Sequence, residues 1–254
     1  MNPKKIICIT GMHRSGTSLT ASWLEKCGVV LNNTIIGEVG NIKGHFEDKN
    51  FVDFHSKGII KRYPESKGWL IPNNNVLSFE EEEINDAKKI VATFENEKIW
   101  GWKDPRTTLF LNSWQNILPQ NNTIFILLWR PFNQVVNSLI NRSDKAPIDQ
   151  FVLKITKKQS IDNWLYYNQI LLRFKKQFNN SMLFPLDYVL NNSVQIIEYL
   201  NKNFQLNLNK LSIKELFSEE LLSKKNEKDF SNIFNRKIIS KLEDDLIKTS
   251  DLNL

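Results

Sequence analysis

The sequence predicts one α/β domain in which a mostly parallel sheet is flanked by helices. Residues 5–10 and 124–129 contain continuous apolar runs, the pattern of strands whose two faces are both covered by helices. A helix-like segment follows each run, and alternating strands and helices are typical of parallel sheets. The chain has 254 residues, of which 41% are hydrophobic, and this is enough to bury one large core.

The N-terminal segment is expected to form a strand, a loop and a helix. Residues 5–10 form the strand and residues 11–16 the loop. Residues 17–27 carry apolar side chains at helical spacing, and Gly28 is typical of the end of a helix. The apolar stripe of this helix consists of Leu19, Trp23, Leu24 and Cys27.

The middle of the chain continues this alternation. Ser78 and the acidic residues after it are typical of a helix start, so we expect a helix over 80–95. Asp104 and Pro105 likewise fit the N-cap and the first position of a helix over 106–117. The other segments expected here are a loop at 32–44, a mixed helical stretch at 46–60 and a strand at 99–102.

The C-terminal half is expected to complete the sheet and to cover it. Residues 182–185 form a short apolar strand. Helices are expected around Val135, Val136 and Leu139, over 149–178 with one break, and over 193–203. We assign residues 1–210 to the main domain and residues 211–254, which are helical and polar, to a C-terminal extension of the same domain.

The composition argues against a membrane protein, a disulfide-linked protein and a nucleic-acid-binding protein. The apolar run from Ile6 to Ile9 is far shorter than the ~20 residues of a membrane span, and no signal-peptide pattern follows it, so we expect a cytoplasmic protein without an integral membrane segment. Cys8 and Cys27 form neither a disulfide framework nor a metal-ligand spacing. The net charge of +6 suits an anionic ligand, but acidic and basic residues are interspersed, so we do not expect nucleic-acid binding.

The loop after the first strand carries the pattern of a phosphate-binding loop. Two glycines, Gly11 and Gly16, have the spacing of a Walker A motif between a buried strand and a helix. Thr17 stands where an ATP-binding loop has its lysine, and Arg14 supplies a cation inside the loop instead. Backbone N–H groups and the positive helix end would hold a phosphate or a phosphosulfate. The residues assigned to this anion site are Arg14, Ser15, Gly16, Thr17 and Ser18.

A second group of residues points to another phosphate. The strand over 124–129 ends in Arg130, where a Walker B strand would end in an aspartate that binds Mg²⁺. Ser138 follows on the next predicted helix. A cation here in place of the acid does not fit the Mg²⁺ site of a P-loop kinase.

These residues resemble those of the sulfotransferases that use 3′-phosphoadenosine 5′-phosphosulfate (PAPS). The loop is similar to that of the bacterial branch, which reads G-M-H-R-S-G-T-S, and Arg130-Pro131 with Ser138 resembles the family's 3′-phosphate motif. Residues 41–48 and 102–106 are similar to two further family segments, although Ile42 and His45 depart from the first. The resemblance runs from residue 6 to about residue 205 and leaves the C-terminal fifth uncovered.

The resemblance implies a P-loop NTPase-like sulfotransferase fold over residues 1–210. It implies PAPS as donor, 3′-phosphoadenosine 5′-phosphate (PAP) as product, no metal, and a hydroxyl acceptor, for which a carbohydrate or a glycolipid is expected by analogy with bacterial relatives. The oligomeric state does not follow from the sequence. The alternatives are an ATP-dependent P-loop kinase and a non-catalytic nucleotide-binding module.

Sulfuryl transfer needs cations at the leaving phosphate and a base at the acceptor. Arg14 and Lys103 are the expected cations, because both belong to loops at the carboxyl ends of predicted strands. Glu47 is the expected base, since it lies in the family-like segment 41–48, and Glu38 and His45 are its rivals. Of the other histidines, we expect His13 to orient the loop and His55 to be structural.

Overall fold

The computed structural model describes residues 4–32, 46–147, 150–216, 229–230 and 235–254. Within these ranges five strands form one sheet in the order β2-β3-β1-β4-β5, and every neighbouring pair is parallel. The expected α/β class with a parallel sheet is confirmed. The strands are β1 (Lys5–Gly11), β2 (Val30–Leu31), β3 (Ile99–Lys103), β4 (Thr123–Trp129) and β5 (Ser181–Pro185).

Helices connect the strands and pack on both faces of the sheet. The α-helices are α1 (Thr17–Cys27), α2 (Lys49–Arg62), α3 (Glu81–Ala92), α4 (Leu111–Ile117), α5 (Phe132–Lys145), α6 (Lys157–Gln177), α7 (Leu186–Phe204) and α8 (Arg236–Thr249). Short 3₁₀ helices are η1 (Pro64–Ser66), η2 (Pro105–Phe110), η3 (Gln120–Asn122), η4 (Phe151–Leu153) and η5 (Ile213–Glu215). None of the helices in the described ranges combines the length and the apolar character that crossing a membrane would require.

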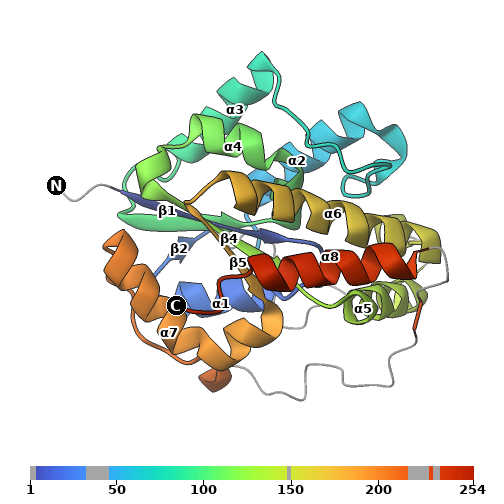
Figure 1. Cartoon of the computed structure of the whole chain (residues 1–254). Helices are drawn as coiled ribbons and strands as arrows, with labels where there is room; N and C mark the ends of the chain where they lie inside the picture. The colour runs from blue at the N-terminus through green and yellow to red at the C-terminus, as the bar shows by residue number, and fades with distance from the viewer. Residues whose placement is uncertain (1–3, 33–45, 148–149, 217–228, 231–234) are drawn as a thin grey trace.

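Side chains of β1 alternate between two cores because successive residues of a strand point to opposite faces. Ile7 and Ile9 face α1 and α7, which lie together below the sheet in Figure 1. Ile6 and Cys8 face a larger, aromatic-rich core on the other side, to which α2, α4, α6 and α8 contribute. Burial on both faces explains the continuous apolar runs of β1 and β4.

Several boundaries differ from the sequence prediction. The cap of α3 is Glu80 rather than Ser78, because Glu80 and Glu83 form a reciprocal capping box and the Ser78 carbonyl instead accepts a hydrogen bond from Arg62. The predicted helix over 106–117 begins as the 3₁₀ helix η2, and the helix expected over 193–203 begins seven positions earlier as α7. Strand β2 was not predicted, since two residues are too short for a recognisable pattern.

The last residues of the chain form hydrogen bonds with the edge strand β5. Helix α8 packs on α6, and its buried Leu246 belongs to the aromatic-rich core. After α8, the Asp251 carboxylate accepts a 2.8 Å hydrogen bond from the Leu183 amide, and the Asp251 amide donates to the Leu183 carbonyl at 2.9 Å. Lys175 of α6 pairs with the same carboxylate at 2.9 Å. The C-terminal residues therefore satisfy hydrogen-bonding groups on the open edge of β5.

Candidate active site

The loop between β1 and α1 has the shape of an anion cradle. Gly16 caps α1 at φ 87°, and no side chain caps the helix, so the first-turn amides remain available to a ligand. A Cβ at Gly16 would lie 2.4 Å from a methyl carbon of Leu186, and one at Gly11 would lie 2.1 Å from the Leu128 carbonyl oxygen. Both glycines of the motif are therefore required by close packing as well as by the turn.

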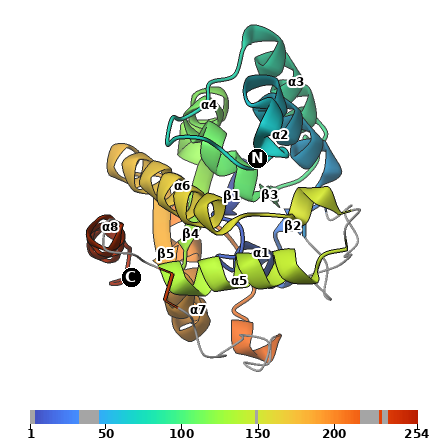
Figure 2. The same ribbon diagram turned by 90° about the vertical axis from the view of Figure 1, so that its right-hand side faces the viewer.

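Arg14 is held at φ 71°, a backbone conformation that is unfavourable for a residue with a side chain. Its Nε donates a 2.9 Å hydrogen bond to the Ser138 hydroxyl on α5. Burial, and then the charge of Arg130, lower the pKa of Arg14. The loop and the β4–α5 segment, separated by more than a hundred residues, thus meet in one cationic site. Figure 2 shows α5 in front of α1, on the side of the molecule that faces the viewer.

The hydroxyl groups of the loop differ in their surroundings. The Ser15 hydroxyl is buried and has no hydrogen-bond partner among the described residues. The Ser18 hydroxyl accepts a hydrogen bond from Lys103 at 3.1 Å, and Thr17 is buried at the first turn of α1. A buried hydroxyl without a partner is costly, and an oxyanion bound in the cradle would satisfy it.

Lys103 brings a cation to the loop from the neighbouring strand. It ends β3, which pairs with β1, and its Nζ lies 2.5 Å from Glu47 Oε1 as well as near Ser18. The Lys103 side chain is 1% exposed. An ammonium group therefore reaches the loop although position 17 is threonine.

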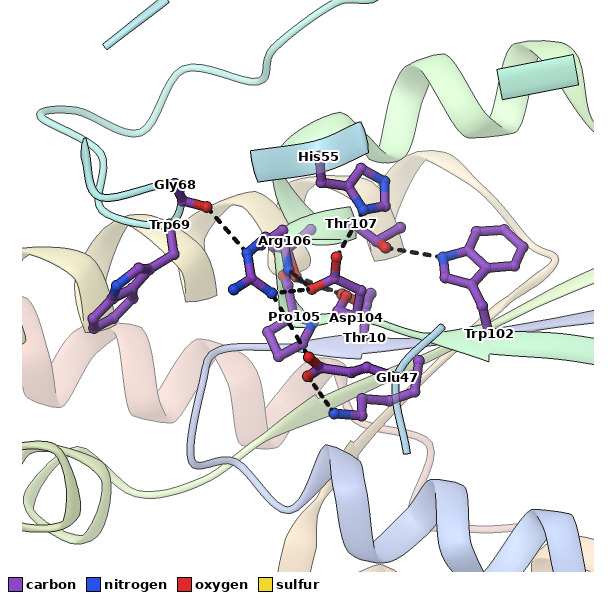
Figure 3. Close-up of polar contacts among 12 residues, drawn as sticks. Thr10, Glu47, His55, Gly68, Trp69, Trp102, Asp104, Pro105, Arg106 and Thr107 are labelled. Atoms are coloured by element: carbon purple, nitrogen blue, oxygen red, sulfur yellow. Dashed lines mark hydrogen bonds and ion pairs between the residues drawn. The ribbon is translucent and has the colours of Figure 1, made fainter. Parts of the chain in front are cut away.

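Glu47 precedes α2 and is almost buried between two cations. One oxygen is held by Lys103, while Oε2 lies 3.9 Å from a nitrogen of Arg106, longer than a hydrogen bond (Figure 3). The guanidinium of Arg106 is itself oriented by the Gly68 carbonyl at 3.1 Å and by Asp104 at 2.9 Å. Glu47 Oε2 therefore keeps lone pairs that can accept a proton.

Asp104 contacts both Arg106 and His55 and so fixes the positions of residues next to Glu47. Its carboxylate caps η2 through the Arg106 amide at 2.9 Å and contacts His55 Nδ1 at 2.8 Å (Figure 3). His55 Nε2 in turn accepts a hydrogen bond from Trp114 at 2.9 Å. Burial alone would raise the pKa of Asp104, but the charge of Arg106 and the hydrogen bond with His55 outweigh it and hold the pKa well below its usual range. His55 is fully buried in this network, as expected of a structural residue.

An aromatic wall closes one side of the site. His13 of the loop packs edge-on against Trp69, with ring centres 4.8 Å apart, and the Tyr167 hydroxyl donates to the Trp69 carbonyl at 2.6 Å. Burial, followed by the charges of Arg106 and Arg142, holds the pKa of His13 well below its usual range. His13 is therefore neutral, which fits packing of the loop rather than charge.

Most of the residues predicted from sequence come together. The structure places the following in or beside one cationic site: Arg14, Ser15, Gly16, Thr17, Ser18, Glu47, Lys103, Arg130 and Ser138. Arg130 Nε donates to Gln134 at 2.7 Å. Glu38 and His45 lie outside the described residues, so their candidacy stays a prediction. In the described part of the chain, no three His, Cys, Asp or Glu residues are grouped as metal ligands.

Sequence reasoning missed Arg106, Arg142 and Trp69. Arg106 ends the segment 102–106 that was already recognised, but its direction toward Glu47 depends on η2. Arg142 stands one helical turn after Ser138, so its position on the same face of α5 could have been read from the spacing. Trp69 gave no local signal, since it lies in a segment without regular structure.

Comparisons with known proteins identify the fold. No protein-family model and no curated protein matches the sequence. Sulfotransferase STF9 from Mycobacterium avium superposes with a TM-score of 0.59 at 11% identity, over 99% of this chain and 78% of that one. Sulfotransferase STF1 from Mycobacterium tuberculosis gives 0.49 at 9% identity, over 97% and 77%, and the sulfotransferase domain of a Synechococcus olefin synthase gives 0.48 at 13%, over 98% and 93%. The chain has the sulfotransferase fold, as predicted from the phosphate loop.

Proposed function

We propose that this chain is a sulfotransferase that moves a sulfuryl group from PAPS to a hydroxyl acceptor. The fold shared with STF9 supports the reaction class. The observation that carries the proposal is the contact between Arg14 Nε and Ser138 Oγ, because it joins two anion-binding elements in one site. A donor with phosphate groups on both its 5′ and its 3′ positions requires two such elements, whereas ATP lacks the 3′-phosphate.

The described residues fit such a donor. The uncapped N-terminus of α1, the unpartnered Ser15 hydroxyl and Arg14 suit the 5′-phosphosulfate. Arg130, which directly follows β4, and Ser138, which accepts from Arg14, suit the 3′-phosphate. Position 130 is arginine where an Mg²⁺-dependent kinase would carry an acid, which supports a metal-independent donor over ATP.

The proposed reaction is a direct transfer. The acceptor oxygen forms a bond to sulfur, the bond between sulfur and the 5′-phosphate oxygen breaks, and PAP leaves with that electron pair. The acceptor proton passes to Glu47 Oε2, the oxygen that Lys103 does not hold. Lys103 and Arg14 offset the negative charge that grows on the leaving phosphate.

Nucleotide binding tests the donor. By isothermal titration calorimetry, PAP should bind more tightly than 5′-AMP or ATP, and Arg130→Ala should weaken PAP binding by about 1.5–3 kcal/mol, the value of a charge-assisted hydrogen bond. Binding of 5′-AMP, which lacks the 3′-phosphate, serves as the internal control and should not change. Equal affinities of the wild-type protein for PAP and 5′-AMP would refute the assignment.

We further propose a carbohydrate or glycolipid hydroxyl as the acceptor, by analogy with bacterial relatives. Incubation of cell extract with ³⁵S-labelled PAPS in the presence of EDTA should place the label in glycan or lipid fractions. Label found only in protein tyrosine would exclude this acceptor class, and Mg²⁺-dependent transfer of ³²P from γ-labelled ATP, with no transfer of ³⁵S, would favour the kinase.

A further inference from the structure

A partly buried arginine of α5, Arg142, lies beside the site and has no part in the donor contacts proposed above. It stands one helical turn after Ser138, so the two side chains leave the same face of α5. Its guanidinium carbon lies 5.6 Å from the centre of the Trp69 ring. Because the guanidinium is planar and lies over the Trp69 ring, this contact limits the orientations that the guanidinium can take.

Arg142 forms no ion pair with any residue in the described part of the chain, although its side chain is partly buried. Its Nε is buried without a hydrogen-bond partner among the described residues. Glu47, the carboxylate that acts on it electrostatically, is instead held by Lys103. Burial, and then the charges of Arg14 and Arg106, lower the pKa of Arg142 to about 10, so it is still a cation at neutral pH. An anion bound there would relieve an excess of positive charge.

Interaction with the free carbonyl groups at the end of α5 does not explain the position of Arg142. Cations in the last turn of a helix often interact with its free carbonyls. Here Lys154 already donates to the carbonyls of Ser143, at 2.9 Å, and Ala146, at 2.6 Å. Lys145 in the same turn is exposed to solvent, whereas Arg142 lies inward against Trp69.

The position of Arg142 indicates the acceptor side of the site. Trp69, whose ring it contacts, follows Gly68, and the Gly68 carbonyl accepts a hydrogen bond from Arg106. A nitrogen of Arg106 lies 3.9 Å from Glu47 Oε2. Trp69 also packs against His13 of the phosphate loop, so Arg142 lies on the side of the site formed by Trp69, Arg106 and Glu47. Since Glu47 is the proposed base, a group bound by Arg142 would belong to the molecule whose hydroxyl is deprotonated.

We propose that Arg142, backed by Trp69, binds an oxyanion of the acceptor, so that this enzyme sulfates hydroxyls of acidic molecules such as uronic acid sugars. The proposal rests on the proposed function, because it takes the donor to lie at Arg14 and Arg130. The guanidinium offers parallel N–H groups that match a carboxylate, and this contact places the neighbouring hydroxyl near Glu47.

Two matched sugars test the proposal: 4-nitrophenyl β-D-glucuronide and 4-nitrophenyl β-D-glucoside, which differ in one carboxylate. The wild-type protein saturated with PAP should bind the glucuronide ~10-fold more tightly or better, which is the effect of one charge-assisted hydrogen bond. Arg142→Gln should abolish this preference and leave PAP affinity within ~3-fold, while Arg142→Lys should restore part of it. Lys145→Gln, an exposed change in the same turn, should behave as wild type.

Two results would overturn the proposal. A wild-type PAP complex without preference for the glucuronide excludes the subsite, and an Arg142→Gln protein that loses as much PAP affinity as Arg130→Ala places Arg142 in the donor site. A titration of the glucuronide without PAP tests the anion subsite at Arg142 separately from the proposed sulfotransferase function. A protein that fails to bind PAP but binds the glucuronide through Arg142 would refute the sulfotransferase assignment and retain the anion subsite.

Discussion

Replacing Glu47 with glutamine separates its two roles, as a base and as the partner of Lys103. Glutamine keeps an oxygen that can accept the Lys103 hydrogen bond but has no charge and cannot accept the proton of the acceptor. A hydrogen bond between charged groups contributes about 1.5–3 kcal/mol, against about 0.5–1.5 for a neutral acceptor. We therefore expect Glu47→Gln to lower the free energy of unfolding by about 1–2 kcal/mol.

The catalytic effect should be much larger than the structural one. Loss of a general base lowers kcat by ~10²–10⁴-fold. PAP affinity should be unchanged or higher, because a negative charge is removed from the surroundings of an anionic ligand. Chemical denaturation, PAP calorimetry and transfer of ³⁵S from PAPS measure the three quantities on the same protein. The exposed Glu65→Gln is the matched control and should retain wild-type values in all three.

A comparison with Lys103→Met distinguishes catalysis from positioning. If Glu47 only holds Lys103 against Ser18, both variants should lose the same fraction of kcat and both should bind PAP more weakly. A Glu47→Gln enzyme that keeps more than half of its kcat would refute the assignment, and the base would then be sought at Glu38 or His45.

Other predictions concern stability. Gly16→Ala should lower the free energy of unfolding by about 1–3 kcal/mol. The loss should exceed that of Gly28→Ala, because both positions have positive φ but only an alanine at Gly16 would overlap Leu186. Equal losses in urea unfolding would contradict the overlap. Asp104 has a folded pKa below its unfolded value of about 3.9, so its ionised form stabilises the fold above that value and the contribution is lost as the pH falls toward the folded pKa. The stability difference between wild type and Asp104→Asn should be constant above about pH 5 and shrink below about pH 4, and a difference that grows on acidification would be inconsistent with the ion pair. Asp251→Ala should lower the free energy of unfolding by about 1–3 kcal/mol and accelerate hydrogen exchange of the Leu183 amide, which donates to Asp251. An unchanged exchange rate would show that this contact is not formed.

The sequence by itself determined the parallel sheet and the phosphate loop, because both are encoded locally. Continuous apolar residues in β1 and β4 report burial on two faces, and the positive φ of Gly16 is a local requirement of the turn, whereas the packing of Gly11 on Leu128 and of Gly16 on Leu186 was seen only in the structure. The order of glycines, Arg14 and hydroxyls between a strand and a helix was enough to predict an anion site.

Only the tertiary structure decided which distant groups share that site. The contacts of Lys103 with Glu47, and of Arg14 with Ser138, join residues 56 and 124 positions apart, and no local pattern carries such distances. The charge on Arg142 could be read from the sequence, but its contact with Trp69 and its unsatisfied Nε among the described residues could not. Ion pairing and burial depend on the three-dimensional neighbours of a group, so the proposed acceptor side could be argued only once β3, η2 and α5 were seen to bring their residues to the site.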